Sequence, residues 1–478
     1  MPRIVLQSEI TSHNTPDDVW IVVNGIVYDL TEFAPDHPGG SEIIYQYAGH
    51  DATDEYNKFH APSLIQKTLD KEHRVGSFDA STATDEWKSA IVTDKSKVTT
   101  NTDAKPPLSD IINLYDFERV ASTTLSNKAW AYISGASNDC LTRDANLSFL
   151  QRIWLRPAVM RDVGAVSTKT TLFGCNLDMP VYIAPTGTVR TAGEEGELAL
   201  AKGAANTGII HCISTPSSYP HEEVLDATPQ HAFLQLYVNK DRQKSGDLVR
   251  RATATGKVKA IFVTVDLPVV SKREADERAK NETSGPGKDW KGAGLARQTG
   301  SFIDPTLNWN DISWLRRLTD LPIVIKGIQR WEDAKLAMQR GCDGIVLSNH
   351  GGRAADTAPP SIVLLLELHR NCPEIFHKLT VLIDGGFRRG SDVVKAICLG
   401  ASAVGIGRPF FYSVNYGQEG VEHAAEILKD EIETAMRLCG MTDLIKDASP
   451  DYVNTSDIDH HVIKGGHPYA RRRGHSKL

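Results

Sequence analysis

The sequence lacks several features that would place the protein in a class at once. No apolar run approaches the roughly 20 residues needed to cross a bilayer, so no membrane segment is predicted. The seven cysteines are dispersed and include no C-x-x-C pair, which indicates reduced thiols in an intracellular protein. With a net charge of −7, the chain also gives no reason to expect nucleic-acid binding.

The acidic residues are concentrated near the start of the chain. Residues 1–79 hold 13 acidic and 5 basic side chains, and the remainder is close to neutral. An acidic surface can steer a basic docking partner. Solubility alone explains the same pattern equally well, so both interpretations stay open.

The organisation of the chain predicts two domains, because 478 residues are too many for one core. Residues 1–79 are rich in His, Asp and aromatic side chains. Residues 80–108 are mostly Ser, Thr, Asp and Lys and close with a Pro pair, which is typical of a linker. A third pattern fills 109–440, and 441–478 form a C-terminal tail.

The two termini bear on location. The first residues show neither a secretory signal nor an amphipathic presequence. The chain closes with Ser476-Lys477-Leu478 behind a basic run, a pattern typical of peroxisomal import. We therefore expect a peroxisomal protein, with the cytoplasm or the mitochondrial intermembrane space as the alternative.

Residues 109–440 alternate short β-branched runs with helical patterns. Continuous apolar strands separated by helices indicate a parallel sheet covered on both faces, and eight units predict a closed (β/α)₈ barrel of the α/β class. The rival doubly wound fold would need a G-x-G-x-x-G turn after its first strand, which is absent. Residues 284–300, rich in Gly and Lys, are expected to form a loop over the barrel mouth. The expected strands are 181–185, 208–214, 232–238, 260–266, 322–327, 344–349, 380–386 and 403–407.

Residues 1–79 carry a pattern that fits haem. The motif 37-HPGG-40 follows a strand-like segment at 20–30, and His60 lies 23 positions after His37. A b-type electron carrier needs two neutral imidazoles on opposite faces of the iron, so His37 and His60 are the expected axial ligands. With both axial positions filled, such a domain carries electrons and leaves no open site for oxygen. Over 5–79 the sequence resembles cytochrome b5, a small α+β domain with haem b.

In a (β/α)₈ barrel the working residues follow the C-terminal ends of the strands. His350 has the near-neutral pKa of a general base, and Asp266 could fix its tautomer. Guanidinium groups grip carboxylates bidentately, so Arg273 and Arg353 suit a small acid. Lys326 could offset negative charge on a reduced flavin. Singly each has a structural explanation, such as a helix cap for Asp266, but packing hardly explains their convergence.

Glycine-lined strand ends at 384–390 and 405–408 resemble the barrel phosphate site. Each of the two segments also carries arginine, as Arg388 and Arg408. The combination predicts bound FMN.

With its S-N-H-G-G-R and D-G-G-x-R-R-G motifs, 110–440 resembles the FMN-dependent L-2-hydroxy acid oxidase/dehydrogenase family, which includes glycolate oxidase. The fused haem module resembles the flavocytochrome L-lactate dehydrogenases. The resemblance implies His350 as catalytic base, Asp266 as its partner, Tyr237 at the substrate hydroxyl, and Tyr132, Arg273 and Arg353 at the carboxylate. It implies as FMN contacts Thr186, Ser214, Gln235, Thr264, Lys326, Asp384, Gly386, Arg388, Gly407 and Arg408. It also implies a homotetramer.

The expected reaction converts a small L-2-hydroxy acid to the 2-oxo acid, with FMN as first acceptor and the b-type haem as second. Cytochrome c is the final acceptor that the flavocytochromes suggest. Direct oxygen reduction to peroxide, as in glycolate oxidase, is the alternative. Hydride transfer and a carbanion route stay open. A carrier with a silent barrel, and an FMN-dependent isomerase, are the rival functions.

The sequence departs from the family pattern around the substrate. Tyr132 is followed by Ile133 where the family has a tyrosine pair, and Gly135 comes one position early. Gly187 stands for the usual Ala, and Pro216 for a larger apolar residue. If the missing methyl at Gly187 opens room, the pocket tolerates substrates bulkier than lactate, because such changes shift selectivity by about 1–3 kcal/mol.

Overall fold

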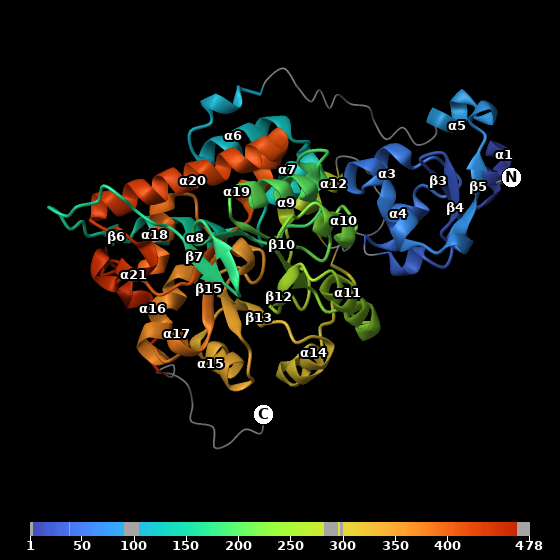
Figure 1. The fold of residues 1–478 in the computed structure, drawn as a ribbon. Coiled ribbons are helices and arrows are strands. Elements are labelled where there is room, and N and C mark those ends of the chain that lie inside the picture. Colours follow the sequence, from blue (N-terminus) through green and yellow to red (C-terminus); the bar gives the residue numbers. More distant parts are fainter. Residues whose placement is uncertain (1–2, 38, 90–104, 282–294, 297–299, 466–478) are drawn as a thin grey trace.

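The computed structural model describes residues 3–37, 39–89, 105–281, 295–296 and 300–465, and these form a small N-terminal domain and a large barrel domain (Figure 1). No helix within these ranges is long and apolar enough to cross a membrane.

The small domain is built on a five-stranded sheet in the order β1-β5-β4-β3-β2. Its central hairpin turns at Asn24 and Gly25, whose φ angles are 51° and 74°, as a two-residue primed turn requires. The predicted segment at 20–30 is therefore a strand pair. The strands are β1 (Ile4–Val5), β2 (Asn14–Thr15), β3 (Asp18–Val23), β4 (Ile26–Asp29) and β5 (Arg74–Phe78).

Short helices cover the sheet of the small domain. They enclose a core that includes Ile21, Tyr28, Leu30 and Ile44. The helices are α1 (Gln7–Ser12), α2 (Ser41–Tyr45), α3 (Thr53–Phe59), α4 (Pro62–Thr68) and α5 (Asp85–Ser89), with 3₁₀ turns at Ala34–Asp36, Lys71–His73 and Ala80–Thr82.

The expected linker does not begin at residue 80. Trp87, in α5, is buried against a second core of this domain, and its Nε1 donates a hydrogen bond of 2.9 Å to Gly49 O. Composition missed this because a single buried aromatic holds an otherwise polar segment. The rest of the expected linker, up to residue 104, lies outside the described residues.

The large domain is a closed parallel barrel in the order β10-β11-β12-β13-β14-β15-β16-β9, which confirms the predicted (β/α)₈ fold. Tyr182, Phe233 and Phe262 pack inside it. Each predicted run overlaps one strand: β9 (Val181–Ile183), β10 (Ile210–Ile213), β11 (Ala232–Leu236), β12 (Val258–Thr264), β13 (Ile323–Ile328), β14 (Gly344–Leu347), β15 (Thr380–Asp384) and β16 (Ala403–Ile406).

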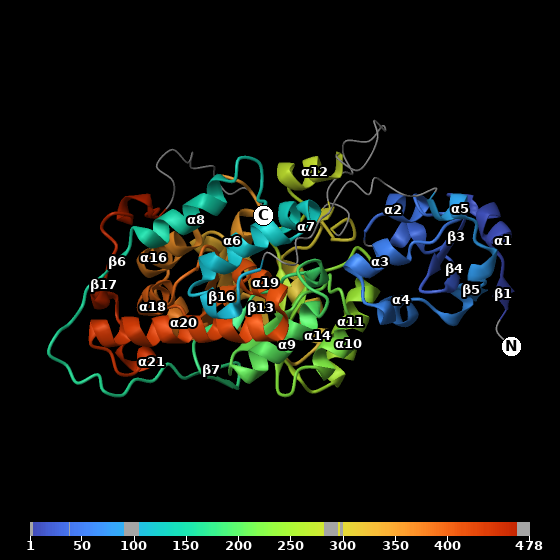
Figure 2. The same cartoon turned by 90° about the horizontal axis from the view of Figure 1, so that it is seen from above.

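Helices surround the barrel (Figure 2). The longest, α20 (Gly417–Cys439), packs on α9 and α18. The others are α6 (Leu114–Thr124), α7 (Asn127–Ser134), α8 (Leu141–Gln151), α9 (Gly196–Asn206), α10 (His221–Asp226), α11 (Arg242–Ala254), α12 (Glu274–Asn281), α14 (Ile312–Leu318), α15 (Trp331–Gln339), α16 (Ser361–Asn371), α17 (Ile375–Lys378), α18 (Gly390–Cys398), α19 (Arg408–Ser413) and α21 (Leu444–Asp447).

The expected C-terminal tail at 441–478 is partly a folded piece of the barrel domain. Strand β17 (Val453–Asn454) pairs with β6 (Trp154–Leu155), and Leu444 is fully buried. A second hairpin joins β7 (Thr170–Leu172) and β8 (Cys175–Leu177). Residues 466–478, with the terminal Ser-Lys-Leu, lie outside the described residues.

The small domain lies against one side of the barrel domain, with α3 and α4 facing it in both views (Figures 1 and 2). Among the described residues, three ion pairs cross between the domains. Lys128 pairs with Glu55 at 3.2 Å, Lys67 with Glu223 at 2.8 Å, and Lys244 with Asp36 at 3.2 Å.

Candidate active site

A histidine that follows β14 and an aspartate that follows β12 meet at the barrel mouth, across the intervening β13. His350 Nδ1 donates a hydrogen bond of 2.9 Å to Asp266 Oδ1, and Tyr237 OH lies 3.2 Å from His350 Nε2. Gly327, with φ 114°, allows this approach, because a Cβ there would lie 2.6 Å from Asp266 Cβ. The aspartate therefore sets the tautomer and leaves Nε2 to accept a proton.

The electrostatics of this pair suit a base. Burial lowers the pKa of His350 below its ordinary value, and the Asp266 carboxylate opposes that shift. For Asp266, burial would raise the pKa, but the imidazole and Lys326 outweigh it, so its pKa is lowered. The resting pair is thus a neutral imidazole beside a carboxylate, which can stabilise the imidazolium once a proton arrives.

Two guanidinium groups lie beside the imidazole. Burial and the charge of Arg353 lower the pKa of Arg273 to about 10, and Arg273 Nε is buried without a hydrogen-bond partner among the described residues. Arg353 donates to the carbonyl oxygens of Tyr132, Ile133 and Gly135 and its guanidinium carbon lies 5.1 Å from the Tyr132 ring centre. A carboxylate here would offset two positive charges that repel each other.

Next to these groups lies a cluster that fits a flavin. Lys326 Nζ lies 3.1 Å from Asp384 Oδ2 and donates to Ser348 Oγ at 3.0 Å. Burial would lower the pKa of Lys326, but Asp384 and Asp266 raise it overall, so the lysine stays cationic. Thr186 Oγ1 and Asp384 Oδ1 are buried with no partner among the described residues, as polar atoms that contact a cofactor would be.

The remaining predicted flavin residues extend the cluster in two directions. Ser214 Oγ donates to Gln235 Oε1 at 3.3 Å, and Gln235 Nε2 donates to Thr264 Oγ1 at 2.9 Å. Ser214 lines the same cavity as His350, whereas Gln235 lies one hydrogen bond and Thr264 two hydrogen bonds behind it. The predicted phosphate residues also line that cavity: Gly386, Arg388, Gly407 and Arg408.

The phosphate end is strongly cationic. Burial and the charge of Arg353 lower the pKa of Arg408 to about 9. Gly407 leaves its surface open, with nothing nearer to a would-be Cβ than 3.6 Å. Arg388 is not free, since it lies 3.2 Å from Glu118. The buried Arg388 and the half-buried Arg408 beside open glycine backbone fit the phosphate of FMN.

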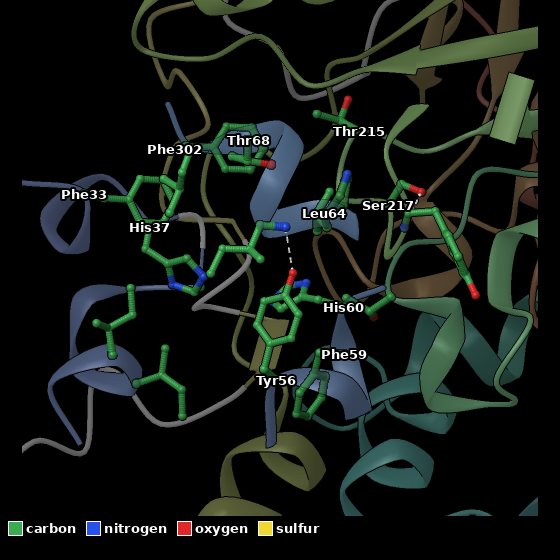
Figure 3. Close-up of a pocket in the computed structure, with 18 of the residues that line it drawn as sticks. Phe33, His37, Tyr56, Phe59, His60, Leu64, Thr68, Thr215, Ser217 and Phe302 are labelled. Atoms are coloured by element: carbon green, nitrogen blue, oxygen red, sulfur yellow. Dashed lines mark hydrogen bonds between the residues drawn. The ribbon is translucent and has the colours of Figure 1, made fainter. Parts of the chain in front are cut away.

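A second cavity, of about 430 Å³, lies between the small domain and the barrel domain, and both His37 and His60 line it. The two ring centres are 6.3 Å apart (Figure 3), which fits one iron between them, given metal–imidazole bonds of about 2 Å. Burial lowers the pKa of His37, and burial together with His37 lowers that of His60 to about 3. His60 Nδ1 has no hydrogen-bond partner among the described residues. Two neutral imidazoles in an apolar crevice fit haem b.

The histidine turn of this crevice depends on its glycine. His37 Nδ1 donates a hydrogen bond of 3.1 Å to Gly40 O. A Cβ on Gly39 would lie 2.5 Å from His37 Cε1, so a larger residue would displace the ring. The HPGG motif therefore packs the glycine directly beneath the imidazole.

The two cavities adjoin each other. Pro216 and Tyr237 line both, and Thr215, Ser217 and Phe302 extend from the barrel domain into the haem cavity (Figure 3). Of the expected mouth loop 284–300, residues 284–294 and 297–299 lie outside the described residues. Leu295 lines the haem cavity and Ala296 the catalytic cavity. A flavin at one end and a haem at the other would be close neighbours.

The structure corrects one expectation about the substrate pocket. A Cβ on Gly187 would lie 2.5 Å from Pro216 O and 2.8 Å from Pro216 Cγ. The space that an alanine methyl would take is therefore filled by Pro216, and Gly187 by itself opens no room. Sequence reasoning treated the two positions separately, but they form one contact.

Some residues of the site escaped sequence reasoning. Ser348 accepts hydrogen bonds from both Lys326 Nζ and the amide of His350. It is the first residue of the S-N-H-G-G-R motif, which could have identified it. The Asn146 and Asn349 side chains form reciprocal amide hydrogen bonds of 2.8 Å, and Asn146 had no signal. Arg190, which contacts the small domain, and Glu197, which joins two loops of the barrel domain, resemble ordinary surface charges in the sequence.

Comparison with known proteins agrees with both halves of this geometry. Residues 121–455 match the FMN-dependent dehydrogenase family and residues 7–79 the cytochrome b5-like heme/steroid binding domain. The chain is 42% identical over 479 aligned positions to L-lactate dehydrogenase (cytochrome) of Saccharomyces cerevisiae, covering 94% of this chain and 80% of that one.

Two further similarities widen the comparison. A peroxisomal (S)-2-hydroxy-acid oxidase of Oryza sativa subsp. japonica is 40% identical, over 69% of this chain and 92% of its own. Among solved structures, a double variant of flavocytochrome b2 with sulfite bound has a TM-score of 0.69 and 40% identity, covering 79% of this chain and 97% of its own.

Proposed function

This chain belongs to the FMN-dependent dehydrogenase family and carries a cytochrome b5-like haem domain, and from that premise we propose how its residues oxidise a small L-2-hydroxy acid. The enzyme is an FMN- and haem-dependent L-2-hydroxy acid dehydrogenase. The observation that supports the proposed chemistry best is the imidazole of His350, hydrogen-bonded to Asp266 at 2.9 Å beside the buried Arg273 and the half-buried Arg353.

The guanidinium groups position the substrate. Arg273 and Arg353 hold the carboxylate, and Tyr132 packs against Arg353 on the same side. Tyr237 OH supports the substrate hydroxyl from its position beside His350 Nε2. Fixing the carboxylate and the hydroxyl together leaves the Cα hydrogen with one orientation, which lowers the entropy cost of the reaction.

Oxidation to the 2-oxo acid releases two electrons and two protons from the substrate. His350 Nε2 takes one proton, either from the hydroxyl with hydride loss from Cα or from Cα itself in the carbanion route. Asp266 stabilises the resulting imidazolium. FMN, held beside Lys326 and Arg408, would supply an acceptor for the two electrons together with the second proton, and haem, held by His37 and His60, would supply a one-electron acceptor.

We propose a lactate-like acid as the substrate, as the name of the yeast relative suggests. The final acceptor is proposed to be cytochrome c, supported by the 13 acidic against 5 basic side chains of residues 1–79, which would attract a basic partner. Direct reduction of oxygen is the second candidate, favoured by similarity to the rice oxidase and by the terminal Ser-Lys-Leu, on which we propose peroxisomal import. Removing those three residues and imaging the protein in cells tests the location.

We also propose a homotetramer. Trp154, Val159, Met160 and Leu438 are 65%, 79%, 101% and 69% exposed, and Ala158 N donates to Cys439 O, so these apolar side chains lie over one region. Exposed apolar patches typically mark contacts between proteins. Light scattering on the parent and on the Met160→Glu protein tests this: a smaller assembly in the variant supports the proposal, and a monomeric parent overturns it.

The experiment that tests the function is a visible spectrum of the purified holoprotein before and after an L-2-hydroxy acid is added without oxygen. We expect the flavin band to bleach and the reduced haem bands to rise in the same sample. Adding cytochrome c or oxygen afterwards identifies the acceptor. An oxidised flavin that persists with both L-lactate and L-mandelate would contradict the proposal.

A further inference from the structure

One arginine of the barrel domain reaches the backbone of a haem ligand. Arg190, in the 3₁₀ turn Val189–Thr191 after β9, donates from Nη1 a hydrogen bond of 3.0 Å to His60 O. Its guanidinium carbon lies 5.6 Å from the Tyr219 ring centre. Over the described part of the chain no carboxylate forms an ion pair with this guanidinium. Its positive charge beside the haem crevice is therefore not neutralised by an acidic side chain.

The backbone of Arg190 is held in place from several sides. Its amide donates to Ser218 Oγ at 3.3 Å. Gly196, with φ 48°, packs directly against Arg190: a Cβ on this glycine would lie 2.8 Å from Arg190 Cγ and 3.0 Å from Arg190 N. Arg190 Nε is buried. The side chain therefore leaves a rigid base, unlike the long surface lysines of the other inter-domain contacts.

A buried carboxylate joins the loop of Arg190 to the neighbouring loop. Glu197 is fully buried, and its Oε1 accepts from Val189 N at 3.1 Å and from Ser218 N at 2.9 Å. Ser218 O in turn accepts from Ala61 N at 2.8 Å. The two loops, residues 186–191 and 214–219, are called the two-loop platform below. It contacts the haem domain at two consecutive residues, His60 and Ala61.

The opposite end of the two-loop platform faces the flavin site. Thr186 and Ser214 line the catalytic cavity, and Thr188 N donates to Pro216 O at 3.0 Å, which ties the loops together. The platform thus fixes the position of a haem ligand relative to the flavin residues. Electron transfer between the two groups depends on that separation.

We propose that Arg190 is a positioning residue for electron transfer, which docks His60 on the two-loop platform and favours the reduced haem while the domains are docked. A positive charge near the iron stabilises the added electron, and more so where water is excluded. Since the charge belongs to the barrel domain, the haem loses it when the domains separate and becomes a better donor to an external acceptor. The inference rests on the proposed function.

The alternative is that Arg190 is one inter-domain contact among several. The chain offers matched controls, because Lys67 and Lys244 also form single contacts across the interface but neither contacts His60. Both lysines are about half exposed, and pairs of that kind contribute little. An effect specific to Arg190 therefore separates the two explanations.

The test compares full-length holoprotein variants Arg190→Gln, Arg190→Lys, Lys67→Gln and Lys244→Gln. The haem midpoint potential is measured by spectroelectrochemistry, and the rates of flavin bleaching and haem reduction by stopped flow with L-lactate. Hydrogen exchange of the peptide containing the Ala61 amide reports docking without any turnover.

We expect Arg190→Gln to lower the haem potential, to speed exchange at Ala61 and to slow haem reduction about tenfold, as loss of a charge-assisted hydrogen bond implies, with flavin bleaching unchanged. Arg190→Lys should keep the potential closer to that of the parent, and the lysine controls should keep it unchanged. Parent-like potential and haem reduction in Arg190→Gln would overturn the inference, as would equal losses in the controls. If the parent flavin fails to bleach with L-lactate or L-mandelate, the proposed function itself fails.

Discussion

Pro216 O lies 2.5 Å from the position that a Cβ on Gly187 would occupy. The two residues belong to different βα loops, and both line the catalytic cavity. Backbone atoms cannot move aside as the end of a flexible side chain can. The loop that carries Pro216 can therefore take its position only because residue 187 is a glycine.

Replacing Gly187 with Ala should damage the enzyme. The added methyl meets a carbonyl, so the loop at 214–219 must shift, at a cost of about 1–3 kcal/mol. We expect a lower thermal midpoint and a lower kcat/KM with L-lactate. Gly174→Ala is the matched control, because nothing lies within 4 Å of a Cβ at that position, although its φ of 77° adds backbone strain. A Gly187→Ala enzyme at least as active as the parent would contradict this interpretation of the contact.

Replacing Pro216 with Ala should widen the pocket instead. The change removes Pro216 Cγ, which lies 2.8 Å from the position of a Cβ on Gly187, while Pro216 Cβ and the carbonyl remain. We expect the ratio of kcat/KM for L-mandelate to that for L-lactate to rise about tenfold, as removing apolar pocket atoms typically does. Steady-state kinetics with both acids measure it. Tyr219→Phe, a change in the same loop that keeps the ring, serves as the control and should leave the ratio unchanged.

Replacing His350 with Gln should abolish substrate-driven flavin reduction. Loss of a general base costs at least about a hundredfold, while the flavin and haem spectra should remain, because this side chain lies outside the haem crevice. Stopped-flow bleaching measures the effect. Tyr237→Phe keeps the ring and removes only the hydroxyl, so its loss should be smaller.

The pH profile should report the same imidazole. A base must be neutral to accept a proton, and burial lowers the pKa of His350 below 6.5. We therefore expect kcat/KM to be constant above pH 6.5 and to decrease only at lower pH, where His350 becomes protonated. Asp266 raises the pKa of His350, so Asp266→Asn should move the acid limb to lower pH while reducing the level region. An acid limb that stays in place would show that another group titrates.

Stability should depend on pH through His211, a buried strand residue. Neither ring nitrogen has a hydrogen-bond partner among the described residues, and burial lowers its pKa from 6.5 to about 3. The folded state therefore binds no proton here between pH 6.5 and about 3, whereas the unfolded chain does. The contribution of His211 to the free energy of unfolding is fully present above pH 6.5. Below that pH it decreases by about 1.4 kcal/mol per pH unit.

His211→Leu should remove this dependence. Thermal unfolding at pH 7 and pH 5 should show a smaller decrease in midpoint for the variant than for the parent. His377→Leu, at an exposed position, is the control and should follow the parent. An unchanged pH dependence in the His211 variant would mean that other groups dominate acid destabilisation.

The sequence was most informative where one local pattern decides a structure. Each of the eight apolar runs is long enough for one strand and is followed by a helical pattern, which predicted the barrel and placed His350, Arg273 and Lys326 at the same end. HPGG and a second histidine likewise predicted the haem crevice, because the geometry of the turn and the ligand chemistry are both local.

Boundaries and contacts between distant segments were less accessible. Residues 80–89 resemble a linker, yet Trp87 and Thr82 fix them to the haem domain. Residues 441–478 were expected to form a tail, although Val453 pairs with Leu155 some 300 positions earlier. In both cases a few side chains decide the outcome, and composition averages over them.

The sequence by itself determined the two folds, the cofactors and the chemical types of the site residues, because strand period, turn geometry and ligand preference act over a few neighbours. Only the tertiary structure decided that Pro216 fills the space beside Gly187, that Glu197 joins two loops, and that Arg190 contacts the carbonyl of a haem ligand. Those relations depend on distances between segments far apart in the chain, which folding sets and local pattern does not record.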